Sequence, residues 1–280
     1  MFKKFILWYL RNFPVDFGKH RIAKLLTLPN QNEPVKYLNG DQMVFDLDLN
    51  EYQMKQIFLF DRYEKNSVRH LLHYLNKIKK NNITILDVGA NIGFYTMYLS
   101  RFGEKLNAKV HSFEPNPVTF DALESHAEQN NLKNCVLNPF GLSDKAQEIE
   151  ISYNPKNLGA ASVFGNSGRN KAKVKLRTLD DYCNENNISE IDIIKVDIEG
   201  SELNFLEGGK SVINRSKHLL VVMEIVDENC IIAGYDANYL FNYMTERGFK
   251  AFAPKSWPFG LKQIKSLPEN FHDNIFFIKS

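Results

Sequence analysis

Short apolar runs alternate with amphipathic stretches from residue 83 to the end of the chain. Five apolar runs predict strands, at residues 83–88, 110–113, 135–138, 191–196 and 219–225. Three amphipathic stretches predict helices, at residues 95–102, 119–130 and 237–246. Residues 249–253 and 274–278 predict two final strands that pair in antiparallel fashion at one edge. This alternation predicts an α/β fold with a mostly parallel, doubly wound sheet.

The first eighty residues follow a different pattern. A basic stretch over residues 1–24 is followed by a linker at 29–34, an alternating segment at 43–49 and a predicted helix over 63–79. We therefore predict an N-terminal extension and cap at residues 1–80, lying over the carboxyl edge of the sheet, and a main domain at residues 81–280. The segment 154–173, rich in glycine and small residues, is predicted to be a loop that closes as a lid.

Composition narrows the class of protein. Hydrophobic residues make up 44% and charged residues 24% of the 280 positions, which excludes disordered and fibrous chains. The net charge of +2 disfavours a nucleic-acid partner. Three cysteines without paired spacing predict buried thiols in a reducing, cytoplasmic setting.

The basic N-terminal stretch leaves two interpretations open. Its apolar run, residues 5–10, is too short for a signal peptide or a membrane span. Residues 1–24 carry six Lys or Arg and one acidic residue, Asp16, so a helix lying peripherally on the anionic inner face of a membrane is one interpretation. We favour the other, a helix packed on its own domain.

The turn after the first predicted strand, LDVGANIGFYT at residues 86–96, lies where open parallel sheets bind ligands. Gly89 and Gly93 are spaced G-x-x-x-G, unlike the G-x-G-x-x-G of dinucleotide sites. Asp87 would repel a pyrophosphate and suits a cationic ligand such as S-adenosylmethionine. Glu114, at the end of the second strand, can accept both ribose hydroxyls, which fits S-adenosylmethionine and NAD equally.

Six motifs occur in order: LDVGANIGFYT, FEPNP, NPFGLSD, LGAAS, LRTLDDY and IDIIKVDIEGSELNFLEGG. From about residue 43 onward, the chain resembles the FkbM-type class I methyltransferases. This resemblance implies a Rossmann-like sheet of seven strands with the last strand antiparallel. It also implies S-adenosylmethionine as cofactor and methyl transfer, usually to a hydroxyl of a sugar or another small glycan-like or polyketide-like acceptor.

The resemblance also implies roles for particular residues. The cofactor's methionine end would be lined by Asp87, Gly89, Asn91, Gly93 and Thr96. Its ribose would be held by Glu114, and its adenine would lie beside Ser143 and Asp144. Glu64 belongs to the segment that leads into the family motifs, and it is either a pocket residue or a favourable charge at a helix start.

Catalytic chemistry is expected at the end of the fourth strand, in the sequence KVDIEG. Alternation places Lys195, Asp197 and Glu199 on one side while the strand lasts. Asp197 or Glu199 would take the proton of an acceptor hydroxyl, and Lys195 would tune its pKa. The structural alternatives are a Lys195–Asp197 ion pair and a helix cap made by Glu199.

A metal held by Asp197, Glu199 and Glu224 is a further alternative, ranked below a base that works without metal. The sequence therefore predicts an O-methyltransferase with a small-molecule or glycan acceptor, and it leaves the oligomeric state open. The competing functions are a non-catalytic scaffold with the same fold and an NAD-linked oxidoreductase, which the glycine spacing disfavours.

Overall fold

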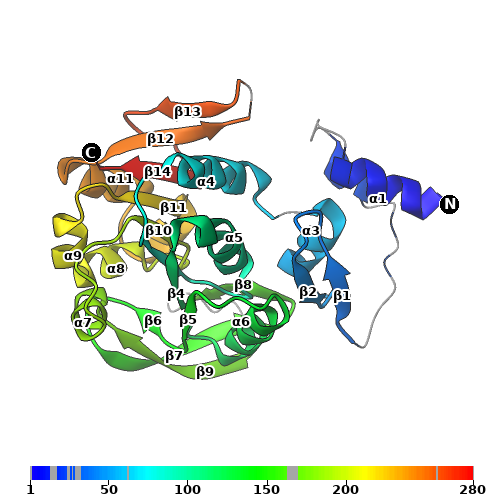
Figure 1. The fold of residues 1–280 in the computed structure, drawn as a ribbon, viewed down its shortest axis with the longest axis horizontal. Helices are drawn as coiled ribbons and strands as arrows, with labels where there is room; N and C mark the ends of the chain where they lie inside the picture. Colours follow the sequence, from blue (N-terminus) through cyan, green and yellow to red (C-terminus); the bar gives the residue numbers. More distant parts are fainter. Residues whose placement is uncertain are drawn as a thin grey trace.

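The computed structural model describes residues 2–12, 18–23, 26, 28, 33–61, 63–162, 170–256 and 258–279. Its central layer is an eight-stranded sheet with the order β13-β12-β14-β11-β10-β3-β4-β5 (Figure 1). The strands are β3 (Thr84–Val88), β4 (Lys109–Phe113), β5 (Cys135–Asn138), β10 (Ile193–Val196), β11 (Leu220–Val226), β12 (Lys250–Lys255), β13 (Gly260–Gln263) and β14 (His272–Ile278). The α/β class predicted from the sequence is confirmed.

The end of the sheet follows the prediction except for one additional strand. β14 is antiparallel to both β11 and β12, which confirms an antiparallel last strand. The predicted antiparallel pairing of residues 249–253 with 274–278 is confirmed by β12 and β14, although β13 lies outside this pair at the edge of the sheet. The expected count of seven strands was wrong, because β13 pairs with β12 as an eighth. β13 has the sequence GLKQ, and a single large apolar side chain gives no strand pattern.

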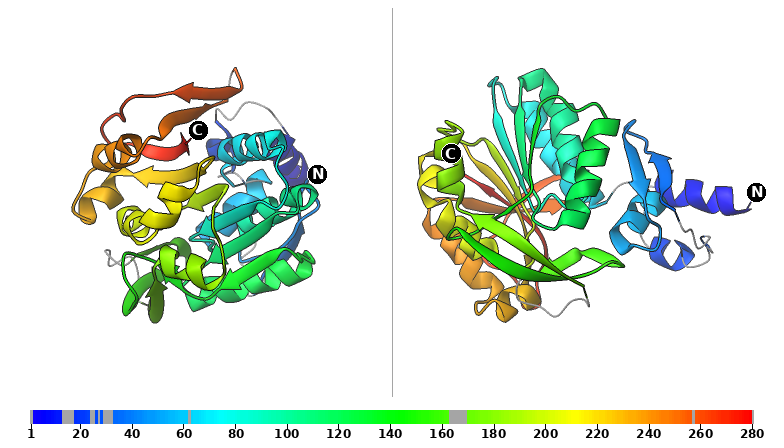
Figure 2. Two further views of the ribbon diagram at one scale, coloured as in Figure 1. Left: turned by 60° about the vertical axis from the view of Figure 1, so that its left-hand side comes forward. Right: turned by 90° about the horizontal axis from the view of Figure 1, so that it is seen from below.

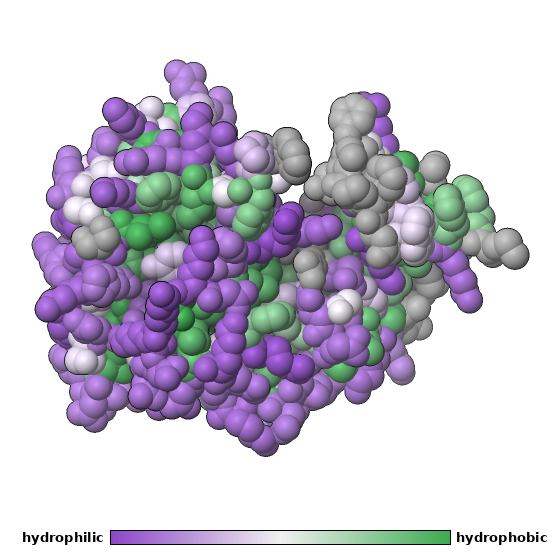
Figure 3. Space-filling view, turned by 45° about the horizontal axis from the view of Figure 1, so that its top comes forward, coloured by the Kyte–Doolittle hydropathy of each residue, from purple (hydrophilic) through white to green (hydrophobic). Residues whose placement is uncertain are grey.

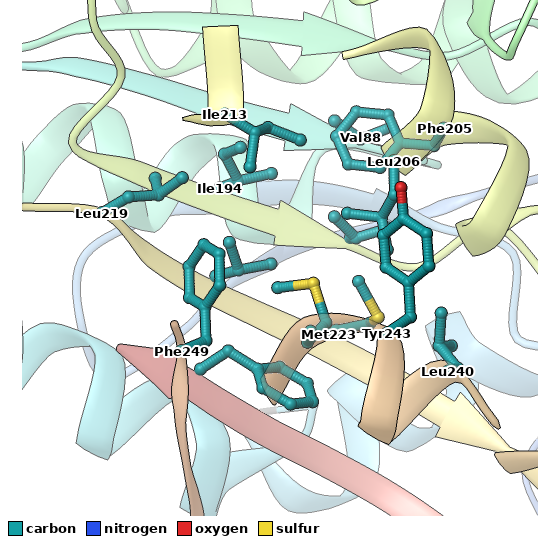
Figure 4. Packing of buried hydrophobic residues seen from close by; sticks show 14 of the residues in the cluster. Val88, Ile194, Phe205, Leu206, Ile213, Leu219, Met223, Leu240, Tyr243 and Phe249 are labelled. Carbon is teal, nitrogen blue, oxygen red and sulfur yellow. The ribbon is translucent and has the colours of Figure 1, made fainter. Parts of the chain in front are cut away.

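Helices cover both faces of the sheet (Figure 2). One face carries α4 (Lys65–Lys77), α5 (Phe94–Gly103) and α6 (Pro117–Gln129), with the short helix η1 (Glu104–Leu106) after α5. The other carries α7 (Leu179–Glu185), α8 (Glu202–Gly208), α9 (Lys210–Arg215) and α11 (Ala237–Glu246), and α10 (Asp227–Ile232) follows β11. Because side chains alternate along a strand, Ile85 packs with the first group and Leu86 with the second. Figure 4 shows the second core, in which Val88, Ile194 and Met223 meet helix side chains.

A second sheet replaces most of the predicted lid. β6 (Gly141–Leu142), β9 (Asn170–Arg177), β7 (Gln147–Asn154) and β8 (Asn157–Ser162) form a four-stranded sheet in that order. The prediction of a loop over 154–173 was therefore wrong for the described part of that segment, while residues 163–169 lie outside the described residues. β7 and β9 alternate in burial, and this alternation favours strand pairing over a loop.

The N-terminal region attaches to the main domain through α3 and β2. It contains α1 (Phe2–Asn12), α2 (Lys19–Ala23), the antiparallel pair β1 (Val35–Leu38) and β2 (Val44–Leu47), and α3 (Tyr52–Phe60). The backbone N–H of Asp46 donates to His126 Nε2 of α6 at 2.9 Å.

Most of the linker at 29–34 lies outside the described residues, and the boundary between 1–80 and 81–280 stays a prediction. No helix within the described ranges is long and apolar enough to cross a bilayer.

Candidate active site

A cavity of about 540 Å³ opens at the carboxyl ends of the central strands. Gly89 follows β3, Glu114 follows β4, and Asp197 follows β10, so three neighbouring strand ends form its floor. The N-terminal region and the second sheet supply further lining residues, among them Tyr52, Gln53, Tyr63, Ile151 and Leu158. The cavity therefore occupies the edge at which open parallel sheets bind ligands.

The predicted cofactor residues fall into two groups. Gly89, Asn91, Glu114 and Ser143 line the cavity. The others lie outside its lining: Asp87, Gly93, Thr96 and Asp144.

Asp87 and Thr96 form a buried network beneath the glycine turn. Thr96 Oγ1 donates to Asp87 Oδ2 at 2.6 Å and lies 2.7 Å from Ser112 Oγ. Burial raises the pKa of Asp87 to about 6, against the lowering effect of the Thr96 hydrogen bond. This network ties β3, β4 and α5 together, so Asp87 supports the glycine turn from beneath and does not line the cavity.

Both glycines of the turn are required by the fold itself. Gly89 has φ +79°, and a Cβ there would lie 1.8 Å from the backbone oxygen of Asp197. Gly93 is the N-cap of α5 with φ +88°, and a Cβ there would lie 2.5 Å from Leu123 Cδ1. Close backbone approach between two strand ends therefore explains Gly89 without any ligand.

Glu114 is held in a fixed orientation at the cavity wall. Its Oε2 accepts from the backbone N–H of Asn91 at 2.8 Å, and its Oε1 accepts from the backbone N–H of Asn116 at 2.9 Å. Burial raises the pKa of Glu114 to about 6. The Asn91 side chain donates to Gln53 at 2.7 Å, whereas its buried Oδ1 has no hydrogen-bond partner among the described residues.

Three carboxylates converge beside a buried lysine. Single oxygens of Glu64, Asp197 and Glu224 lie within 4.8 Å of one another. Lys195 Nζ lies 3.7 Å from Asp197 Oδ2 and 4.9 Å from the ring centre of Tyr95. The predicted ion pair between Lys195 and Asp197 is thus present, and both residues are on the side that strand alternation predicted.

Glu64 enters this cluster from the start of α4. Its Oε2 accepts from the Tyr95 hydroxyl at 2.6 Å and from the Asn274 amide at 2.7 Å. Its backbone has φ +45°, which turns the chain at the N-cap of α4. Glu64 is therefore a member of the carboxylate cluster as well as a residue at a helix start.

Glu199 diverges from the cluster. It has φ +51°, and its Oε2 accepts from the Asn229 amide at 2.5 Å. The backbone N–H groups of Ile198 and Gly200 donate instead to Glu202, at 3.4 and 3.2 Å. The role of loop cap therefore belongs to Glu202. Glu199 lines the cavity, and burial together with the Asp197 charge raises its pKa to about 8.

The charges of the cluster shift one another's protonation. The Asp197 charge, followed by burial, raises the pKa of Glu224 to about 10. Burial lowers the pKa of Lys195, but the surrounding carboxylates outweigh it and raise that pKa overall. At neutral pH Glu224 therefore holds a proton, while Lys195 stays a cation.

The cluster also offers oxygen ligands of the kind that Mg²⁺ prefers. The set brought together is Glu64, Asp197 and Glu224, so Glu64 stands where the sequence suggested Glu199. The ammonium of Lys195 already supplies a positive charge next to Asp197. This charge favours a site that handles protons over one that holds a metal.

We expect Glu224→Gln to stabilise the ligand-free protein by about 2 kcal/mol at pH 7. The folded-state pKa of Glu224 is raised, so its contribution is fully present below the unfolded pKa and is lost as pH rises toward about 10. Glutamine removes the need to take up a proton on folding, and the gain should vanish near pH 4. Urea unfolding at several pH values measures this.

The matched control for this prediction is Glu228→Gln. Glu228 lines the cavity but is exposed, so its replacement should change stability little at any pH. Equal stability of Glu224→Gln and the wild-type protein at pH 7 would contradict the raised pKa.

A sequence model of the FkbM methyltransferase domain matches residues 87–251, more than half of the chain. The chain belongs to the FkbM methyltransferase family. The resemblance predicted from the six motifs is thereby confirmed. FkbM methyltransferases depend on S-adenosylmethionine, so the predicted cofactor is confirmed at the level of the family, and the NAD-linked alternative has no support.

Several relatives of this FkbM protein are known by sequence. The methyltransferase sdnD of Sordaria araneosa is 30% identical, with 46% of this chain and 61% of the relative covered. The hexuronic acid methyltransferase AglP of Haloferax volcanii is 29% identical, with 48% and 53% covered. The 2-O-methyltransferase NoeI of Sinorhizobium fredii is 26% identical, with 51% and 63% covered. The matches thus span little more than half the length of these relatives.

Among solved structures, an FkbM methyltransferase of Methylobacillus flagellatus is similar with a TM-score of 0.45 and 13% identity. That comparison covers 81% of this chain and 54% of the other.

The sequence did not predict some of the residues that line the cavity of this FkbM protein. Tyr52, Gln53 and Tyr63 come from the predicted cap, and Tyr63 directly precedes the turn residue Glu64. His272 of β14 lines the cavity, and its Nε2 lies 3.3 Å from Glu224 Oε1. The motif lead-in could have indicated Tyr63, whereas no sequence pattern pointed to His272.

Proposed function

We propose that this protein transfers a methyl group from S-adenosylmethionine to a hydroxyl oxygen of a sugar or related small acceptor. One observation carries the proposal: a single cavity contains the fixed carboxylate of Glu114 and the carboxylate of Asp197 beside a buried ammonium. The names of the relatives AglP and NoeI, a hexuronic acid methyltransferase and a 2-O-methyltransferase, support an oxygen acceptor on a sugar.

The lining residues fit the proposed cofactor. Glu114 would hold the ribose hydroxyls, because each of its oxygens keeps a lone pair beyond the backbone hydrogen bond it accepts. The unpartnered Asn91 Oδ1 is a buried acceptor suited to the α-ammonium group. The Glu114 and Asp197 carboxylates both line the cavity, which favours a cation over the pyrophosphate of NAD.

The residues of the chain have separable roles in the proposed reaction. When bound, S-adenosylmethionine supplies an electrophilic methyl group, so the protein must align the acceptor oxygen and accept its proton. Asp197 is the proposed base, since its carboxylate lines the cavity and is the one that lies beside the buried ammonium of Lys195. Lys195 positions Asp197, and Tyr63 and Leu158 line the cavity and exclude water from it.

Cofactor binding provides the first test. We expect Glu114→Ala to weaken S-adenosylmethionine binding by about tenfold or more, because charge-assisted hydrogen bonds to the ribose are lost. Titration calorimetry with S-adenosylmethionine and, separately, NAD measures this. Glu114→Gln, which keeps one acceptor oxygen, should bind with intermediate affinity, and Glu228→Ala on the cavity rim should bind normally. Unchanged affinity in Glu114→Ala, or tighter binding of NAD, would overturn the assignment.

Acceptor chemistry provides the second test. The protein is incubated with S-adenosylmethionine labelled in its methyl group and with hexuronic acids, their glycosides and amino sugars as acceptors. Label on a hydroxyl oxygen supports the proposal, and label on nitrogen contradicts it. Cofactor binding without transfer to any acceptor would favour the scaffold alternative.

A further inference from the structure

Helix α1 has two apolar sides with different surroundings. Ile6 and Leu10 are 4% and 1% exposed and pack with Leu59 of α3. Phe2, Phe5 and Trp8 are 69%, 62% and 57% exposed. These three aromatic residues recur every third position and therefore share one side of the helix.

The exposed aromatic side forms part of the molecular surface. The Phe5 and Trp8 rings are stacked with centroids 6.1 Å apart. Figure 3 shows hydrophobic surface at the end of the molecule where α1 lies. Exposed Trp and Phe side chains on one helix are typical of a surface that contacts a partner.

Contacts on the other side of α1 hold the helix in place. Arg11 donates to the backbone oxygen of Phe58 at 2.6 Å, and its guanidinium lies 4.8 Å from the ring centre of Tyr37. The packing of Ile6 and Leu10 adds a buried contact with α3. The favoured interpretation of a helix packed on its own domain is thus confirmed for α1. These contacts fix the orientation in which the helix exposes its aromatic side chains.

The charge of α1 indicates what its exposed side contacts. The helix contains Lys3, Lys4 and Arg11 and no acidic residue, and Lys4 is exposed. Aromatic side chains prefer the boundary between lipid headgroups and acyl chains, and lysines favour anionic headgroups. A second protein surface would need a complementary apolar face, whereas an anionic bilayer matches both the rings and the charges.

We propose that α1 docks on an anionic lipid bilayer, with Phe2, Phe5 and Trp8 inserted at the headgroup boundary and Lys4 against the headgroups. α1 packs on α3, and α3 supplies Tyr52 and Gln53 to the cavity. In the docked protein, α1 would therefore lie between the membrane and α3, the helix that forms part of the cavity wall. This inference does not depend on the proposed reaction.

The test uses the full chain and co-sedimentation with vesicles of phosphatidylcholine, with and without phosphatidylglycerol. Wild-type protein should bind the anionic vesicles. The double variant Phe5→Ser/Trp8→Ser should lower the partition coefficient by about tenfold or more. Lys4→Glu should weaken binding to anionic vesicles, and added salt should weaken wild-type binding.

The matched control is Ile231→Ser/Ile232→Ser on α10, where the two side chains are 62% and 54% exposed. This variant removes a similar apolar area elsewhere and should bind as wild type.

A Trp257→Phe background leaves Trp8 as the single tryptophan, whose fluorescence should shift to the blue on vesicle addition. Wild-type protein that stays in the supernatant, or equal binding by Phe5→Ser/Trp8→Ser, would overturn the proposal. So would a dimer, seen by ultracentrifugation, that the double variant dissociates while vesicles bind neither form.

Discussion

Gly89→Ala is expected to lower the free energy of unfolding by about 4 kcal/mol or more. The added Cβ would lie 1.8 Å from the backbone oxygen of Asp197 and 2.9 Å from Ile198 Cγ2. The backbone oxygen of Asp197 cannot move without displacing the residue that follows β10. The backbone N–H of Asp197 donates a hydrogen bond to the backbone oxygen of Val88 and fixes this residue against β3. The change should therefore disturb both the fold and the cavity floor. Urea unfolding followed by circular dichroism measures the loss.

Gly248→Ala separates the steric clash from the cost of the backbone conformation. Gly248 has φ +86°, similar to the +79° of Gly89, but a Cβ added there would meet no atom of the described residues within 4 Å. Its replacement should cost only about 1–2 kcal/mol, the penalty for a left-handed L-residue. Equal losses in the two variants would show that close backbone approach is not what requires Gly89.

The parts of the fold that could be predicted are those with a strong burial pattern. β10 reads IIKV and is buried at every position, so an aliphatic run identified it despite the lysine. β7 and β9 are half exposed and carry many charged residues, and their pairing depends on the neighbouring strand more than on their own sequence. Local pattern therefore predicted the central sheet and missed the second one.

The site could be predicted as far as it follows strand ends. Asp197 lies where alternation along β10 places it, beside Lys195. Glu199 departs from that alternation because it adopts φ +51° and Gly200 adopts φ +98°, which turn the chain before α8 and leave the Glu199 side chain bonded to Asn229 of α10. Glu64 joins the cluster through the packing of α4 on the sheet, a contact across more than a hundred residues that no local pattern encodes.

Asp197→Asn is expected to lower the rate of methyl transfer by about 10²–10⁴-fold, the usual contribution of a general base. Asparagine keeps the shape of the side chain but cannot accept the acceptor's proton. S-adenosylmethionine affinity should change little, because the proposed contacts with the cofactor are made by Glu114 and Asn91. The rate is measured with the acceptor identified by label transfer, and the affinity by calorimetry.

Two further variants decide whether Asp197 itself is the base. Glu199→Gln should slow transfer less than tenfold, because Glu199 is bonded to Asn229 and lies outside the three-carboxylate cluster. Glu228→Gln, on the exposed rim, should behave as wild type. Loss of transfer in Glu199→Gln with activity retained in Asp197→Asn would assign the base to Glu199.

In Asp197→Asn the pKa of Glu224 should also fall toward its ordinary value, because the Asp197 charge is the main cause of its elevation. The stabilisation gained from Glu224→Gln should therefore shrink when Asp197 is already asparagine, and full retention of that gain would show that the two carboxyls do not share a proton.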